Sequence, residues 1–150
     1  MFHKATELKL KKGTSLEVTF QNGEVKAYDM AVLFEKYPQL EALKDRKLFL
    51  KGKLMGAYGI IWNEELDIEV ETIYEDGDTV RIIPEANMTV ANAVHNARAR
   101  AALSQADLSE KSGIDQSDIS KIERGVSNPS VSTLNRLAKA MDMKLEVEFV

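Results

Sequence analysis

Residues 104–124 read SQADLSEKSGIDQSDISKIER, and this stretch decides the fold of the C-terminal half. Two helical patterns meet at Gly113, a residue that accepts the positive φ of a tight turn. Ser109 supplies the small side chain that a steep crossing of two helices requires. The spacing therefore predicts a helix-turn-helix. Its shared apolar face is expected to consist of Leu108, Ile114, Ile119 and Ile122.

Polar residues mark where these two helices begin. Ser104 is predicted to cap the first helix, and Asp107 is favourable for its dipole three residues later. Asp115 is predicted to cap the second helix, and Asp118 follows in its first turn. The alternative is that Asp115 and Asp118 face DNA phosphates, which would weaken non-specific binding. Residues 89–143 carry 7 Lys and Arg and 6 Asp and Glu, so this half has little positive charge to offset such repulsion.

The motif extends into a longer resemblance over residues 90–141. The chain resembles the XRE family of phage-repressor-like DNA-binding domains, which implies an all-α domain and double-stranded DNA as a partner. The resemblance is carried by Arg98, Leu103-Ser104-Gln105, Leu108, Gly113-Ile114, Gln116-Ser117, Ile119 to Gly125, Asn128-Pro129, and Leu134 to Ala138.

This resemblance implies that residues 115–124 form the recognition helix in the major groove. Gln116 and Lys121 are the expected base readers, since a glutamine amide can bond adenine and a lysine can donate to guanine. Ser117 and Ser120 lie on or near the same face. The expected phosphate contacts are Gln105, Arg124 and Asn128. Arg98 and Glu123 are implied to form a structural ion pair.

The first half of the chain shows short strands with turns between them. Alternation at Leu16, Val18 and Phe20 predicts a strand, and Asn22-Gly23 predicts a type I′ hairpin turn. Asp29 is predicted to cap a short helix with its apolar side at Val32, Leu33, Phe34 and Tyr37. Further strands are expected at residues 48–50, 57–62 and 80–83. This half is similar to a bacterial family of unknown function, a small α+β domain found alone or upstream of an XRE helix-turn-helix; Gly59 to Asn63 and Leu66 to Ile68 carry this similarity.

The change of pattern at Pro84 predicts the domain order. We expect an α+β domain of short antiparallel strands at residues 1–84, a linker at 85–89, an all-α helix-turn-helix domain at 90–143 and a C-terminal strand at 144–150. In that last strand Leu145, Val147 and Phe149 alternate with two glutamates. A lone exposed strand is unstable, so it needs either the first domain's sheet or the same strand of a second chain.

Composition excludes several classes of protein. The chain has 150 residues, no cysteine and two histidines, which excludes disulfides and thiolate metal sites and leaves too few histidines for a three-histidine site. Its longest wholly apolar run, residues 30–34, is far below the ~20 residues that span a bilayer. We expect a cytoplasmic protein with no metal, no cofactor and no enzymatic activity, because no nucleophile and base pair or cofactor motif is present.

The expected function is a sequence-specific transcriptional regulator, acting as a homodimeric repressor because one helix-turn-helix covers only half of a palindromic operator. The first domain could sense a ligand or a protein partner. One alternative is an antitoxin-type regulator that neutralises a partner protein and represses its own operon. Another is a protein-interaction module without DNA binding, which the acidic recognition helix would favour.

Overall fold

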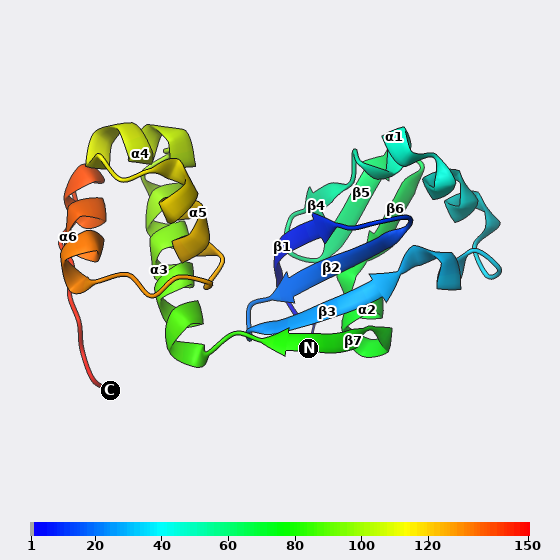
Figure 1. Cartoon of the computed structure of the whole chain (residues 1–150), viewed down its shortest axis with the longest axis horizontal. Helices are drawn as coiled ribbons and strands as arrows, with labels where there is room; N and C mark the ends of the chain where they lie inside the picture. The colour runs from blue at the N-terminus through cyan, green and yellow to red at the C-terminus, as the bar shows by residue number, and fades with distance from the viewer. Residues whose placement is uncertain (1) are drawn as a thin grey trace. The chain divides into compact units, whose positions relative to one another are not determined.

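The computed structural model describes residues 2–150 and divides into two compact units after Ile82 (Figure 1). The N-terminal unit contains strands with short helices, and the C-terminal unit contains helices. The chain is therefore an α+β region followed by an all-α helix-turn-helix region. No helix within residues 2–150 is both long and apolar enough to cross a membrane.

Two antiparallel sheets build the N-terminal unit. The first has the order β1-β2-β3-β7 and opens with the predicted meander, in which Leu16 pairs with Leu10 on one side and with Tyr28 on the other. The second has the order β4-β5-β6. The strands are β1 Ala5–Leu10, β2 Ser15–Phe20, β3 Glu24–Asp29, β4 Lys53–Met55, β5 Gly59–Asn63, β6 Leu66–Glu69 and β7 Asp78–Ile82.

The core of this unit follows the alternation of β2. Leu16, Val18 and Phe20 are fully buried, which confirms the predicted strand. Helix α2 (Val70–Asp76) adds Val70 and Ile73 to the same cluster. These side chains leave water together, and each large one contributes about 1.5 to 3 kcal/mol.

Short helices connect β3 to β4. The 3-10 helix η1 (Met30–Leu33) begins at Asp29, whose carboxylate accepts the Ala31 N–H at 3.0 Å as the sequence predicts. A second 3-10 helix, η2 (Pro38–Lys44), leads into α1 (Arg46–Phe49). The strand predicted at residues 48–50 is wrong, because Asp45 caps Lys47 N–H and starts a helical turn there. Val32, expected on the apolar side, is exposed.

The turn between β2 and β3 also differs from the prediction. A type I′ turn requires positive φ at two residues, but only Gly23 has it, at 92°. The Gly23 N–H donates to Phe20 O at 2.8 Å, and the Asn22 side chain accepts the Glu24 N–H. Asn22 therefore keeps an ordinary backbone and stabilises the turn through its side chain.

Four helices build the C-terminal unit around one apolar cluster. Its buried members include Val94, Leu108, Ile119, Ile122 and Leu137, so the predicted shared face of the motif is confirmed. The helices are α3 Glu85–Arg100, α4 Gln105–Ser112, α5 Gln116–Glu123 and α6 Val131–Ala140. The predicted linker at residues 85–89 is wrong. Pro84 sits at the N-cap position, and the following residues continue directly into α3.

The strand predicted at residues 144–150 is not formed in the single chain, where these residues have no regular secondary structure. A strand exists only through hydrogen bonds to a neighbouring strand, and none is paired with it among residues 2–150. Val147 and Phe149 are consequently exposed.

Candidate nucleic-acid interface

The turn between α4 and α5 is fixed by three local features. Gly113 has φ 71°, the left-handed conformation that ends α4. The Ser109 hydroxyl donates to Ile114 O at 2.6 Å, so the small side chain at the crossing also bonds across the turn. Arg136 of α6 donates to Ser112 O at 2.9 Å. These contacts hold α5 at a defined angle to α4.

A capping box starts α4. The Asp107 N–H donates to the Ser104 hydroxyl at 3.0 Å, and the Ser104 N–H donates to the Asp107 carboxylate at 3.0 Å. Hydrogen bonding of the Asp107 carboxylate to Ser104, to its backbone N–H above all and then to its side chain, lowers the pKa of Asp107 below its ordinary value. Asp115 does not cap α5 with its side chain, which corrects the sequence prediction. Its backbone carbonyl accepts the N–H groups of Asp118 and Ile119 instead.

Glu123, at the end of α5, lies at the centre of a polar network. Its carboxylate accepts hydrogen bonds from Arg98 of α3, the two shortest from Nε to Oε2 and from Nη2 to Oε1, both at 2.9 Å. His95 Nδ1 lies 2.9 Å from the same carboxylate, and Gln105 Nε2 lies 3.4 Å from it. The Glu123 side chain is 4% exposed and the Arg98 side chain 16%. The network therefore joins α3, α4 and α5 at one point.

The outward face of α5 lies opposite its buried face. Ile119 and Ile122 are buried, whereas Gln116, Ser117 and Lys121 are exposed. Spacings of three and four residues place residues 116, 117, 120 and 121 on one side of the helix. Ser120 is half-buried, and its backbone carbonyl accepts Arg124 Nε at 3.3 Å. Within residues 2–150, the side chains of Gln116, Ser117 and Lys121 make no hydrogen bond or ion pair.

The residues expected at phosphates lie in different settings. Gln105 is the first residue of α4, and its side chain reaches toward Glu123 rather than pointing only outward. Arg124 is half-buried at the end of α5. Asn128 is exposed in the loop before α6. The structure thus places all three around α5, and of the three only Asn128 is exposed.

A groove runs between α3 and α6, and the C-terminal tail lies along it. Its volume is about 510 Å³, and its apolar walls include Val90 and Val94 of α3 and Leu134 of α6. Tail residues Leu145 and Val147 line the same groove. Lys144 and Glu146 lie 3.8 Å apart on one side of the extended tail, as expected for residues two apart in a strand.

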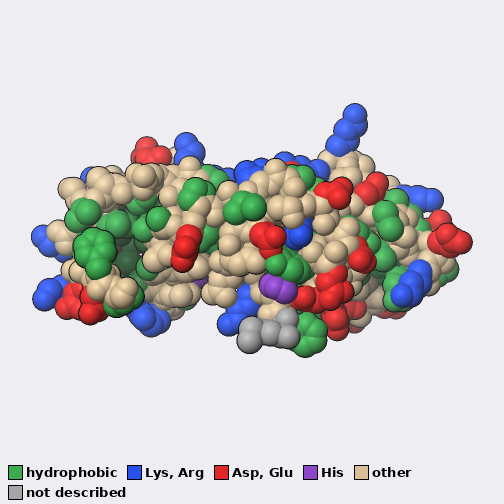
Figure 2. All heavy atoms as spheres, turned by 90° about the horizontal axis from the view of Figure 1, so that it is seen from below, with side chains coloured by type: hydrophobic (Ala, Val, Ile, Leu, Met, Phe, Trp, Pro, Cys, Tyr) green, Lys and Arg blue, Asp and Glu red, His purple; other side chains and the backbone are tan. Residues whose placement is uncertain are grey.

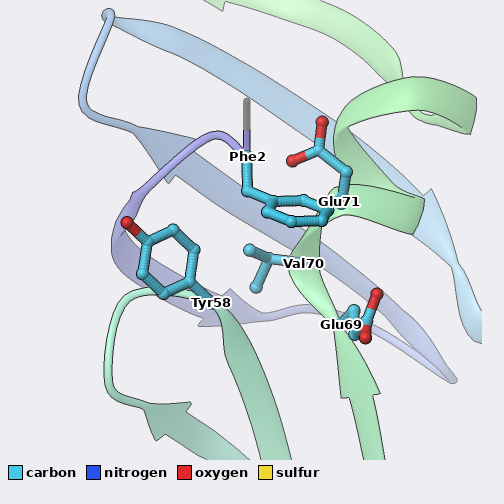
Figure 3. A pocket seen from close by; sticks show the side chains of 5 residues that line it. All are labelled: Phe2, Tyr58, Glu69, Val70 and Glu71. Carbon is cyan, nitrogen blue, oxygen red and sulfur yellow. The ribbon is translucent and has the colours of Figure 1, made fainter.

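The N-terminal unit has a smaller cavity of about 190 Å³ beside the start of α2, lined by Phe2, Tyr58, Glu69, Val70 and Glu71 (Figure 3). The Phe2 ring lies over Val70, and the Tyr58 ring stands beside it. Glu71 accepts the His3 N–H at 2.8 Å, and this bond above all lowers the pKa of its carboxyl group. Phe2 and Tyr58 are 67% and 49% exposed, so the cavity is shallow, and no buried side-chain nitrogen or oxygen within residues 2–150 lacks a hydrogen-bond partner.

Comparison with known proteins assigns both halves. Residues 5–79, half of the chain, match the family described as Protein of unknown function (DUF2442). The chain belongs to this family. Residues 94–147 match the helix-turn-helix family HTH_3, so the DUF2442 domain precedes a helix-turn-helix of the XRE type.

No curated protein matches the chain. One solved structure with similarity is that of "Putative DNA Binding Protein NE0471" from Nitrosomonas europaea ATCC 19718, at 18% identity. The match covers 91% of this chain and 85% of that one, with a TM-score of 0.41. This similarity is too low to assign a function.

Two residues of the interface were not singled out from the sequence. His95 belongs to no motif in the sequence, yet it contacts Glu123. Its position three residues before Arg98 on one helix is the signal that places both on the same face. Arg136 gave no such signal, because its partner is a backbone carbonyl 24 residues away.

Proposed function

We propose that this DUF2442 protein is a sequence-specific DNA-binding regulator of transcription that reads the major groove with residues 115–124. One observation carries the proposal: Gln116, Ser117 and Lys121 form an exposed polar face on α5 whose side chains bond to no other described residue. The opposite face of the same helix is fully packed. Polar side chains that are carried on a well-packed helix, and that make no hydrogen bond to other described residues, are suited to recognise an external partner.

The chemistry of this face matches base edges. The Gln116 amide carries both a donor and an acceptor, which suits adenine N6 and N7. Lys121 can donate to guanine O6 or N7, and Ser117 and Ser120 can bond either base type. Gln105, Arg124 and Asn128 are the proposed phosphate contacts. Because Gln105 also reaches Glu123, its phosphate contact would be coupled to the network that orients α5.

The test is selection of bound sequences from a random duplex pool, followed by binding of variants to the selected sequence and to a scrambled duplex. Gln116→Ala or Lys121→Ala should cost about 1 to 3 kcal/mol on the selected sequence and relax preference at one or two base positions. Asn128→Ala or Arg124→Ala should lower the affinity for the selected sequence and for the scrambled duplex equally. Circular dichroism checks that each variant remains folded.

Replacement of Asp118 with asparagine serves as the control for charge. If Asp118 faces phosphate, the variant should bind the scrambled duplex more tightly, because a repulsive charge has gone. If folded Gln116→Ala and Lys121→Ala variants keep full affinity and selectivity, α5 does not read bases. The helix-turn-helix would then be an interaction module instead.

We also propose that the regulator acts as a homodimeric repressor, with the tail as a dimerisation element. Extended tail residues without a strand partner can pair with the tail of a second copy. Antiparallel pairing centred on Leu145 would place Lys144 opposite Glu146 of the second copy and Met143 opposite Val147. Opposite charges would then meet on one side and apolar groups on the other.

Sedimentation of the full chain and of a chain truncated after Lys144 tests the tail. The full chain should be a dimer at micromolar concentration, and the truncated chain should dissociate. Lys144→Glu should weaken the dimer by placing like charges opposite each other, and adding Glu146→Lys should restore it. A monomeric full chain, or a truncated chain that remains a tight dimer, would remove the tail from the assembly.

A further inference from the structure

We infer that the N-terminal unit carries a second DNA-backbone contact, a cationic surface formed by Lys12, Arg46, Lys47 and Lys51 and here called the α1 patch. This inference rests on the proposed function, because the helix-turn-helix is what brings duplex DNA to the chain. The α1 patch adds sequence-independent contacts to phosphates. It gives the DUF2442 domain a role in affinity.

Hydrogen bonds hold the first three members of the α1 patch together. Arg46 Nη1 donates to the backbone oxygens of Lys11 and Gly13, both at 2.7 Å. These two carbonyls flank Lys12, so the β1–β2 turn is tied directly to the start of α1. Asp45 accepts the Lys47 N–H and fixes the first turn of α1. Lys12 and Lys47 are thereby brought to the same part of the surface as Arg46.

Helical spacing adds the fourth member. Lys51 follows Lys47 by four residues and lies two residues after the end of α1, and this is a spacing at which side chains are neighbours on a helical surface. Lys12, Lys47 and Lys51 are exposed, and none pairs with a carboxylate within residues 2–150. By contrast, the neighbouring Lys11 is paired with Glu17 at 3.1 Å. The α1 patch therefore presents positive charge that the described protein does not neutralise.

The charges of the N-terminal unit are strongly segregated. Residues 44–53 contain five Lys and Arg and one acid, whereas residues 64–78 contain eight Asp and Glu and no Lys or Arg. The acidic segment forms β6, α2 and the start of β7, and α1 and α2 lie at opposite ends of the unit in Figure 1. Figure 2 shows acidic side chains gathered on the face of this unit that the view presents. A unit with a net negative charge thus keeps one positive region.

A polyanion is the partner that this distribution favours. Exposed ammonium groups without partners bind phosphates with release of counterions, and the gain requires no particular base sequence. The N-terminal unit and the helix-turn-helix unit belong to one chain and meet after Ile82, so binding of the same DNA by both would be intramolecular and would gain from effective concentration. Weak phosphate contacts by the α1 patch can then add to the affinity for DNA that α5 already binds.

The experiment measures binding of the full chain to a labelled 40-bp mixed-sequence duplex between about 50 and 200 mM salt. Lys12→Gln/Lys47→Gln should weaken binding about tenfold at the lowest salt. It should also reduce the salt slope, which is the slope of the logarithm of the binding constant against the logarithm of the salt concentration, by about 2. The matched control is Lys4→Gln/Lys36→Gln, which removes the same charge from two exposed lysines elsewhere in the unit. The control should keep the wild-type slope to within about half a unit.

Three results would overturn the inference. The first is an equal change in slope for both double variants, which would reflect net charge alone. The second is an unchanged DNA slope with lost binding to polyglutamate, which would assign the α1 patch to an acidic protein. The third is a wild-type chain that does not bind the duplex at all.

A Gln116→Ala/Lys121→Ala chain separates this inference from the proposed function. If that chain keeps a salt slope that Lys12→Gln/Lys47→Gln then reduces, the α1 patch contacts DNA although α5 does not read it. If the wild type selects a sequence but the Lys12→Gln/Lys47→Gln variant has the wild-type slope, α5 reads DNA and the α1 patch does not contact it.

Discussion

In the C-terminal unit, the Glu123 side chain is 4% exposed and contacts side chains from two other helices, whereas the ion pairs of the N-terminal unit lie nearer the surface. Glu17, for example, bonds to Lys11 and Arg81, whose side chains are 45% and 46% exposed. The N-terminal core consists almost wholly of apolar side chains from the two sheets, from α2 and from the η1–α1 segment between β3 and β4.

The difference shows two ways of fixing a small fold. The N-terminal unit has enough apolar area on its sheets to define its strand register, because a shift by one residue would turn Leu16, Val18 and Phe20 to the other face. The helical unit has short helices, of which α4 and α5 have only eight residues each. A directional polar contact at Glu123 sets the angle between them.

The largest expected effect is therefore from Glu123→Ala. Removal of this carboxylate leaves Arg98 without its partner in a largely buried position, which should destabilise the C-terminal unit by about 3 kcal/mol. The matched change Glu17→Ala in the N-terminal unit should cost about 1 kcal/mol or less, since its partners are solvated. Hydrogen exchange on the full chain assigns the loss to one unit.

A double variant, Arg98→Met/Glu123→Leu, should be much milder than either single change, because no charge remains unpaired. Equal losses for Glu123→Ala and Glu17→Ala would remove the distinction between the units.

The second prediction compares two glycines in left-handed conformation. Gly113→Ala should cost about 2 kcal/mol, because alanine resists positive φ and its methyl group would lie 3.2 Å from Arg136 Nη2. Gly13→Ala, in the β1–β2 turn, should cost about 1 kcal/mol, since nothing lies within 4 Å of the added methyl. Thermal melts of both variants test the order. A more destabilising change at Gly13 would contradict it.

The smallest expected effect is the loss of stability at low pH. The pKa of Asp107 is lowered in the folded chain, so its contribution to stability is present above the pKa of an unfolded aspartate, about 4, and is lost as pH falls through the lower folded pKa. The Tm difference between wild type and Asp107→Asn should therefore shrink from pH 6 to pH 2.5. Glu71→Gln should behave alike, because the His3 N–H lowers the pKa of Glu71. A difference that grows in acid would reverse the assigned sign.

Much of the fold was predictable because it rests on periodicity. The alternation of β2, the turn at Gly113 and the capping role of Ser104 each follow from a local pattern whose physical cause lies within a few residues. Residues 48–50 were wrongly predicted as a strand, because three consecutive apolar residues fit a strand or a helix equally well. The residue that decides for a helix is Asp45, which caps α1. The tail at 144–150 has the pattern of a strand but has no strand partner within the single chain.

The candidate site was predictable in part. The resemblance indicated which residues of α5 face outward, because buried isoleucines at 119 and 122 fix the rotation of the helix. It did not indicate that Gln105, the first residue of α4, also directs its side chain toward Glu123. Contacts of this kind depend on the crossing angles of three helices. Neither propensity nor pattern determines those angles closely enough to place side-chain atoms within hydrogen-bonding distance.

The isolation of the outward side chains of α5 has a consequence for engineering. Gln116, Ser117 and Lys121 support no hydrogen bond or ion pair within residues 2–150, while Glu123 and the isoleucines fix the helix. Positions 116, 117 and 121 can then be randomised together without repacking the scaffold. A library at these three positions would yield altered binding specificities on one unchanged backbone.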